Sequence, residues 1–157
     1  MAKYKAIIHY RPINHRLSRL VDIARNLKKT YQSGRVFVVC FALKNGNQII
    51  TVGTNSYEKV HPCSEFGPYK PFKADYTNTY VPTVHAEIAC LKNLGSWRRD
   101  FSDIELFIVR LDNQPEMNVK ESCPCINCQR VLSGYKFKKI LFSAEDPNLI
   151  GQIKLKR

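Results

Sequence analysis

Two short segments decide the fold: Val84-His85-Ala86-Glu87 and, further along the chain, Pro124-Cys125-Ile126-Asn127-Cys128. They hold three good zinc ligands, which are His85, Cys125 and Cys128. One imidazole and two thiolates leave the fourth tetrahedral position open, which is typical of a catalytic rather than a structural zinc site. Glu87 is not needed as a ligand, and a carboxylate beside the open position is suited to proton transfer. The two segments therefore predict a catalytic zinc site.

In this order, the segments resemble the His-x-Glu and Pro-Cys-x-x-Cys signature of the zinc-dependent cytidine and deoxycytidylate deaminase superfamily. The resemblance covers most of the chain, and a structural Cys/His zinc site is the alternative. It implies an α/β class, three-layer α-β-α fold with a mixed five-stranded sheet. It also implies one zinc ion per chain, with Glu87 as the catalytic acid and base.

The same resemblance implies three substrate contacts in the site. Asn55 is expected to hold a sugar hydroxyl, the N–H of Ala86 to bind the carbonyl of the base, and the carbonyl of Cys123 to accept the exocyclic amine. For Asn55, an ordinary turn in the stretch 53–56 is the alternative.

The apolar pattern predicts a single domain over residues 1–157. Helices are expected over 13–31, from Thr83 to Gly95, and from Cys125 to about Ser133. Strands are expected over 36–43, 48–53, 104–111 and 139–144, with the first two paired antiparallel across an Asn-Gly turn. Eleven residues follow Asp146, too few for a parallel crossover, so 150–156 should return as an antiparallel edge strand.

The C-terminal hairpin bears on the branch of the superfamily. The free-cytidine and bacterial-toxin DNA deaminase branches end in such a hairpin, whereas the deoxycytidylate and tRNA-adenosine branches end in a helix and a parallel strand. The run 84–87, with histidine as the first ligand, instead resembles deoxycytidylate deaminases. The resemblance is mixed and does not assign the chain to one branch of the superfamily.

Charge indicates a polyanionic partner. The net charge is +12, from 25 Lys and Arg against 13 Asp and Glu, and the basic residues gather in 1–35 and 129–157. Such a surface attracts nucleic acid with salt-dependent affinity, although a soluble protein that is simply basic is the alternative. The segment 54–83 interleaves rings with lysines, which suits single-stranded nucleic acid or packing of the segment onto the body. The candidate contacts are Tyr57, Lys59, Lys70, Arg98 and Arg99.

The six cysteines are expected to be reduced, because neither a secretion signal nor an apolar span is evident. This favours a cytoplasmic location and no membrane partner. Cys40 and Cys90 are expected in the core. A second, structural zinc site at His61, Cys63 and Cys123 stays open, although it lacks a fourth ligand.

We therefore expect a zinc-dependent hydrolytic deaminase that converts cytosine to uracil within a polynucleotide, with single-stranded DNA favoured. The alternative is deamination of free cytidine or deoxycytidine nucleotides in pyrimidine metabolism. A nucleic-acid-binding protein that lost catalysis is a third reading, against which Glu87 argues. Cytosine is the expected substrate base, with adenine as the alternative. The sequence does not determine the oligomeric state.

Overall fold

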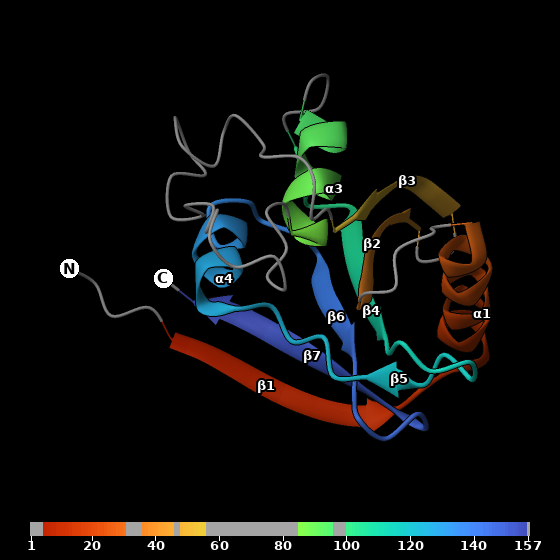
Figure 1. Ribbon diagram of the computed structural model, residues 1–157. Coiled ribbons are helices and arrows are strands. Elements are labelled where there is room, and N and C mark those ends of the chain that lie inside the picture. Colours follow the sequence, from red (N-terminus) through yellow and green to blue (C-terminus); the bar gives the residue numbers. More distant parts are fainter. Residues whose placement is uncertain (1–4, 31–35, 46–47, 56–84, 96–99, 157) are drawn as a thin grey trace, which may run out of the picture.

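The computed structural model describes residues 5–30, 36–45, 48–55, 85–95 and 100–156, which form one sheet with helices on both faces (Figure 1). The strands are β1 (Lys5–Pro12), β2 (Phe37–Lys44), β3 (Gln48–Thr54), β4 (Ile104–Leu111), β5 (Val119–Lys120), β6 (Lys139–Ser143) and β7 (Leu149–Lys156). The helices in this part of the chain are α1 (His15–Thr30), α3 (Ala86–Gly95) and α4 (Ile126–Leu132).

The sheet runs in the order β1-β7-β6-β4-β2-β3, and β5 pairs with β4. The strands β4 and β6 are parallel, whereas β6 and β7 are antiparallel. The expected antiparallel return of the C-terminal segment is therefore confirmed. Both helices of the expected zinc site and all five expected strands are present within a few residues of their expected bounds.

The expectation of five strands is wrong, because the described residues form a seven-stranded sheet. The two additional strands are β1 and β5. In β1, which pairs with β7 at one edge, no described side chain is fully buried, and Ile8 and Tyr10 are 40% and 51% exposed. Such a strand lacks the apolar face that marks a half-buried strand. The strand β5 has only two residues, too few for any periodicity.

The sheet separates two hydrophobic cores, as the three-layer expectation requires. Alternate residues of β2 point to opposite faces: Phe37, Val39 and Phe41 pack with α1, whereas Cys40 and Ala42 pack with α3 and α4. Among the described residues, no helix is both long and apolar enough to cross a membrane.

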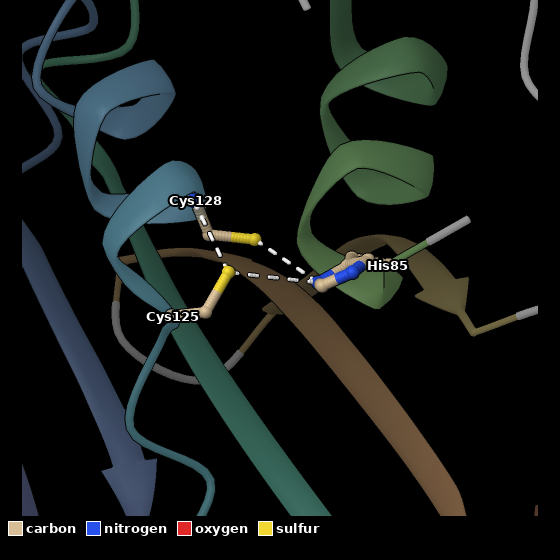
Figure 2. Close-up of side chains that lie close together, drawn as sticks. All are labelled: His85, Cys125 and Cys128. Atoms are coloured by element: carbon tan, nitrogen blue, oxygen red, sulfur yellow. Dashed lines mark hydrogen bonds between the residues drawn. The ribbon is translucent and has the colours of Figure 1, made fainter. Parts of the chain in front are cut away.

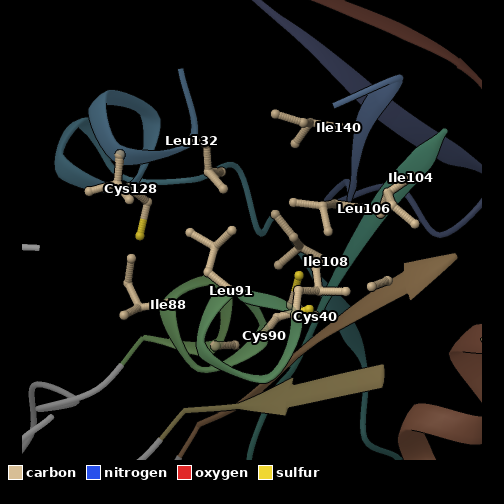
Figure 3. Close-up of a cluster of buried hydrophobic side chains, with 14 of the residues drawn as sticks. Cys40, Ile88, Cys90, Leu91, Ile104, Leu106, Ile108, Cys128, Leu132 and Ile140 are labelled. Atoms are coloured by element: carbon tan, nitrogen blue, oxygen red, sulfur yellow. The ribbon is translucent and has the colours of Figure 1, made fainter. Parts of the chain in front are cut away.

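One core supports both helices of the expected zinc site (Figure 3). Ile88 and Leu91 enter it from α3, and Cys128 and Leu132 enter it from α4. Cys40 and Cys90 are fully buried here, as expected. Because the two helices share this core, the positions of their N-terminal ends are coupled through it.

Gly53 of β3 allows α3 to pack close to the sheet. A Cβ at this position would lie 2.2 Å from the backbone nitrogen of Cys90 and 2.5 Å from the carbonyl oxygen of Ala86. Any larger residue would push against the helix backbone. The absence of a side chain here therefore sets how near the start of α3 lies to the sheet.

Candidate active site

Three zinc-binding side chains meet where α3 and α4 begin (Figure 2). His85 directly precedes α3, Cys125 is the N-cap of α4, and Cys128 lies in its first turn. The Nδ1 atom of His85 is 3.5 Å from the Sγ of Cys128 and 3.8 Å from the Sγ of Cys125. Tetrahedral zinc with ordinary bond lengths separates nitrogen from sulfur by about 3.6 Å. The donor set fits zinc in both type and spacing.

The N-terminal end of helix α4 stabilises the thiolate form of Cys125. Its Sγ accepts a hydrogen bond from the backbone N–H of Cys128 at 3.4 Å. A hydrogen bond from the Cys128 thiol is the main cause that lowers the pKa of Cys125 to about 4, and burial opposes this effect. A helix N-terminus favours negative charge in the same way. Burial raises the pKa of Cys128, so this thiol depends on the metal to ionise.

Glu87 lies beside the ligands in the first turn of α3 and is only 6% exposed. Burial raises its carboxyl pKa, and the neighbouring His85 opposes that shift. Among the described residues, the group whose donor atoms lie within 4.8 Å of one another consists of His85, Cys125 and Cys128, without Glu87. This buried carboxyl therefore lies beside the ligand group without being part of it, and its proton transfer stays a prediction.

A cavity of about 260 Å³ opens onto this cluster. Its lining includes all three residues that the sequence nominated for substrate contacts, namely Asn55, Ala86 and Cys123. Ala86 opens α3, where backbone N–H groups lack partners within the helix. Burial raises the pKa of the Cys123 thiol to about 11, and Cys123 is not part of the zinc-binding group.

Asn55 forms part of the cavity wall and also anchors the start of β2. Its Oδ1 accepts a hydrogen bond from the N–H of Val38 at 3.0 Å, and its Nδ2 donates to the carbonyl of Val36 at 3.1 Å. Only 1% of Asn55 is exposed. A buried amide tied to two backbone groups does more than an ordinary turn residue. Its contact with a sugar stays a prediction.

The family model for the zinc-binding region of cytidine and deoxycytidylate deaminases matches residues 14–144. The chain belongs to this family. As a member, the protein is a zinc-dependent deaminase that acts on cytosine, with zinc as its cofactor. A crystal structure of a dCMP deaminase from the cyanophage S-TIM5, in apo form, has a TM-score of 0.47 and 18% identity over 82% of each chain. No curated protein sequence matches significantly.

The deaminase pocket also contains residues that sequence reasoning missed. Arg110 and Glu121 line the cavity. Ser122 lines it too, and its buried hydroxyl donates to the carbonyl of Ile108 at 2.7 Å and accepts from the N–H of Ser143 at 3.0 Å. These bonds fix the chain just before Pro124. A charged residue near the end of the apolar run 104–111 was the available signal for Arg110.

Several predicted residues lie outside the part of the chain that the structure describes. They are the candidate nucleic-acid contacts Tyr57, Lys59, Lys70, Arg98 and Arg99, and the candidate zinc ligands His61 and Cys63. Their roles stay predictions.

Proposed function

We propose that this deaminase converts cytosine to uracil within single-stranded DNA. The observation that carries the proposal is a basic groove between β7 and the loop that joins α4 to β6. The groove has a volume of about 300 Å³, and its lining includes Lys136, Lys138, Lys139 and Lys154. Tyr135 and Phe137 also line it, and none of its described lining residues is acidic.

Lysines and aromatic rings side by side suit a nucleic-acid strand. Lysines neutralise backbone phosphates. Tyr135 and Phe137 pack against Phe101 and form an apolar wall beside the lysines. These lysines form no ion pair within the described part of the chain. A mononucleotide fills only the zinc pocket, so it leaves this charge unused. The overall charge of +12 supports the same substrate.

The chemistry is hydrolysis of a carbon–nitrogen bond: cytosine and water give uracil and ammonia. Zinc held by His85, Cys125 and Cys128 supplies a Lewis acid that makes water nucleophilic near neutral pH. Glu87 takes a proton from the attacking water, gives one to the ring nitrogen and passes another to the departing amine. Its burial keeps this exchange away from bulk water.

Two backbone groups orient the base for this attack. The N–H of Ala86 binds the carbonyl of the base, and the carbonyl of Cys123 accepts the exocyclic amine. Asn55 lines the same cavity and binds the sugar.

The groove is tested by the double substitution Lys138→Gln and Lys154→Gln. We expect it to raise KM for a long cytosine-containing oligonucleotide and to reduce the salt dependence of binding by up to two counterions. The matched control, Lys28→Gln with Lys29→Gln on α1, removes the same charge outside the groove. Equal effects of the two variants would reject the groove as the binding surface.

Deamination of a free nucleotide is the second candidate. The zinc pocket, of about 260 Å³, is all that this reaction needs, because a free nucleotide requires no binding surface outside the pocket. Such a pocket suits a single nucleoside unit. Turnover of deoxycytidine monophosphate with no turnover of any oligonucleotide would select this candidate over the first.

A further inference from the structure

We propose that Ser122 and Ser143 are positioning residues for the deamination: together they hold the carbonyl of Cys123 where it accepts the exocyclic amine of the base. This inference rests on the proposed function, in which Cys123 binds that amine, but not on whether the base belongs to a strand or to a free nucleotide. Ser143 ends β6, and Ser122 directly precedes Cys123. We call Ser122 and Ser143 the serine clamp.

The serine clamp lies where strand β4 changes its neighbour. The strand β4 pairs with β6 as far as Ile108 and Phe142, and further along it pairs with β5 at Arg110 and Leu111. The strand β5 has only two residues, and the chain runs from it to Cys123, which lines the zinc pocket. Pairing over two residues leaves most of the positioning of this segment to other contacts.

Both hydroxyls of the serine clamp bridge backbone groups of different strands. The Oγ of Ser143 accepts a hydrogen bond from the N–H of Arg110 at 3.1 Å and donates to the carbonyl of Lys120 at 2.7 Å. The hydroxyl of Ser122 donates to the carbonyl of Ile108 at 2.7 Å and accepts from the N–H of Ser143 at 3.0 Å. The N–H of Ser122 donates to the carbonyl of Ser143 at 2.9 Å. The clamp therefore fixes the segment that ends at Ser122 to both β4 and β6.

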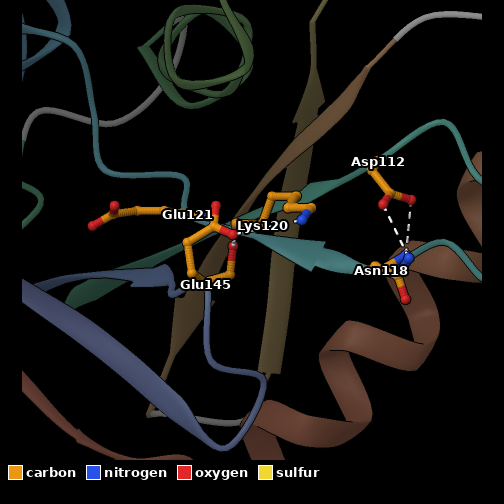
Figure 4. Close-up of polar contacts among 6 residues, drawn as sticks. Asp112, Asn118, Lys120, Glu121 and Glu145 are labelled. Carbon is orange, nitrogen blue, oxygen red and sulfur yellow. Dashed lines mark hydrogen bonds and ion pairs between the residues drawn. The ribbon is translucent and has the colours of Figure 1, made fainter.

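Burial distinguishes the serine clamp from the other contacts of this segment. Ser122 is 7% exposed and Ser143 is 2% exposed, so the loss of either hydroxyl leaves buried backbone groups without a partner. The contacts with Glu145 are exposed instead (Figure 4): its carboxylate accepts the N–H of Glu121 at 3.0 Å and pairs with Lys120 Nζ at 3.6 Å. Solvent weakens such surface pairs. The buried serines are therefore the rigid anchor.

The carbonyl of Cys123 lies between two anchored peptide groups. Ser122 holds the chain on one side, and on the other side the carbonyl of Pro124 accepts a hydrogen bond from Nε2 of Gln129 at 2.8 Å. Within the part of the chain that the structure describes, the carbonyl oxygen of Cys123 itself accepts no hydrogen bond. An acceptor that is fixed in advance and still has its lone pairs available suits the amine of the base as donor.

The test measures recognition of the amine without turnover. Zinc-loaded Glu87→Gln protein, with and without Ser143→Ala, is titrated with deoxycytidine and deoxyuridine, and with two oligonucleotides that differ only in one cytosine or uracil. Uracil carries an oxygen in place of the amine, so it cannot donate to Cys123. We expect Ser143→Ala to reduce the preference for cytosine over uracil about 2- to 10-fold, as for the loss of one hydrogen bond. An unchanged preference, or no preference with both serines present, would overturn the proposal.

Three further variants separate positioning from general stability. Ser143→Thr keeps the hydroxyl and should restore most of the preference. Glu145→Gln removes only the exposed ion pair of the same segment and should leave the preference unchanged. Leu20→Ala opens the core between α1 and the opposite face of the sheet, so it should lower the melting temperature without changing the preference. Equal losses of preference in Leu20→Ala and Ser143→Ala would reject a positioning role.

Kinetics with Glu87 intact add a second readout. A carbonyl displaced by about 1 Å should lower kcat/KM of Ser143→Ala about 10- to 100-fold, and Ser143→Thr should recover most of this loss. The binding comparison separates the two proposals. A cytosine preference that Ser143→Ala reduces supports the serine clamp even if oligonucleotides are not deaminated, in which case only the proposed function fails. An unchanged preference together with normal turnover rejects the clamp and leaves the proposed function standing.

Discussion

Substitution of Gly53 by alanine should damage the active site through the helix backbone. The new Cβ would lie 2.2 Å from the nitrogen of Cys90, 2.5 Å from the oxygen of Ala86 and 2.8 Å from the Cα of Cys90. Real Cβ atoms essentially never approach another heavy atom within 3.0 Å. Strand β3 and helix α3 must therefore separate by about 0.8 Å or more. All three contacts are backbone atoms, so no side-chain rotation can relieve them.

The separation affects both stability and chemistry. Overpacking of a tight interface costs about 1–3 kcal/mol, which lowers the melting temperature by about 2–12 °C for a chain of this size. Ala86 lies between His85 and Glu87, so the shift reaches the zinc ligand and the carboxylate. A misplacement of about 1 Å can slow an enzyme about 100-fold.

The assay combines three measurements on zinc-loaded protein: thermal unfolding, zinc affinity by competition with a chelator, and kcat/KM. Gly95→Ala is the matched control, because a Cβ there meets nothing within 4 Å. It should leave activity unchanged, and the higher helix propensity of alanine should add slight stability. Wild-type zinc affinity and turnover in Gly53→Ala would refute the claim that this close approach positions the site.

Two further predictions concern the ligands and the carboxylate. In metal-free protein at pH 6, iodoacetamide should modify Cys125 before Cys128, because the pKa of Cys125 is lowered to about 4 whereas burial raises that of Cys128. The alkylation rate of Cys125 should fall only as the pH drops through about 4, where its thiolate is protonated. Peptide mapping with and without zinc should show that the metal protects Cys125. Glu87→Gln should retain zinc, measured by metal analysis, and lose at least about 100-fold in kcat, so full turnover in the loaded variant would contradict the assigned proton transfer.

The sequence predicted the parts of the fold that leave an apolar pattern. The runs 36–43 and 104–111 became buried strands because both of their faces are covered. The strand β1 was not predicted from the sequence, because it is an edge strand whose exposed Ile8 and Tyr10 look like scattered apolar residues. Its position depends on pairing with β7, a contact between residues far apart in the sequence.

The active site also contains residues that the sequence could predict and residues that it could not. His85, Cys125 and Cys128 were predictable because metal ligands have strict residue types and short spacings. Arg110 was not, because its place in the cavity lining depends on which strands lie beside β4, and these are contacts between residues far apart in the sequence. Asn55 was recognised, but its bonds to Val36 and Val38 depend on the turn of the chain between β2 and β3.

The most direct test of the account is a side-by-side deamination assay of the zinc-loaded protein. The substrates are deoxycytidine, deoxycytidine monophosphate and a cytosine-containing single-stranded oligonucleotide, each assayed for uracil product, with Glu87→Gln as the blank. We expect uracil in the oligonucleotide at the highest kcat/KM of the three. Turnover of the monomers alone would contradict the polynucleotide proposal, and no uracil from any substrate would contradict cytosine deamination by this chain.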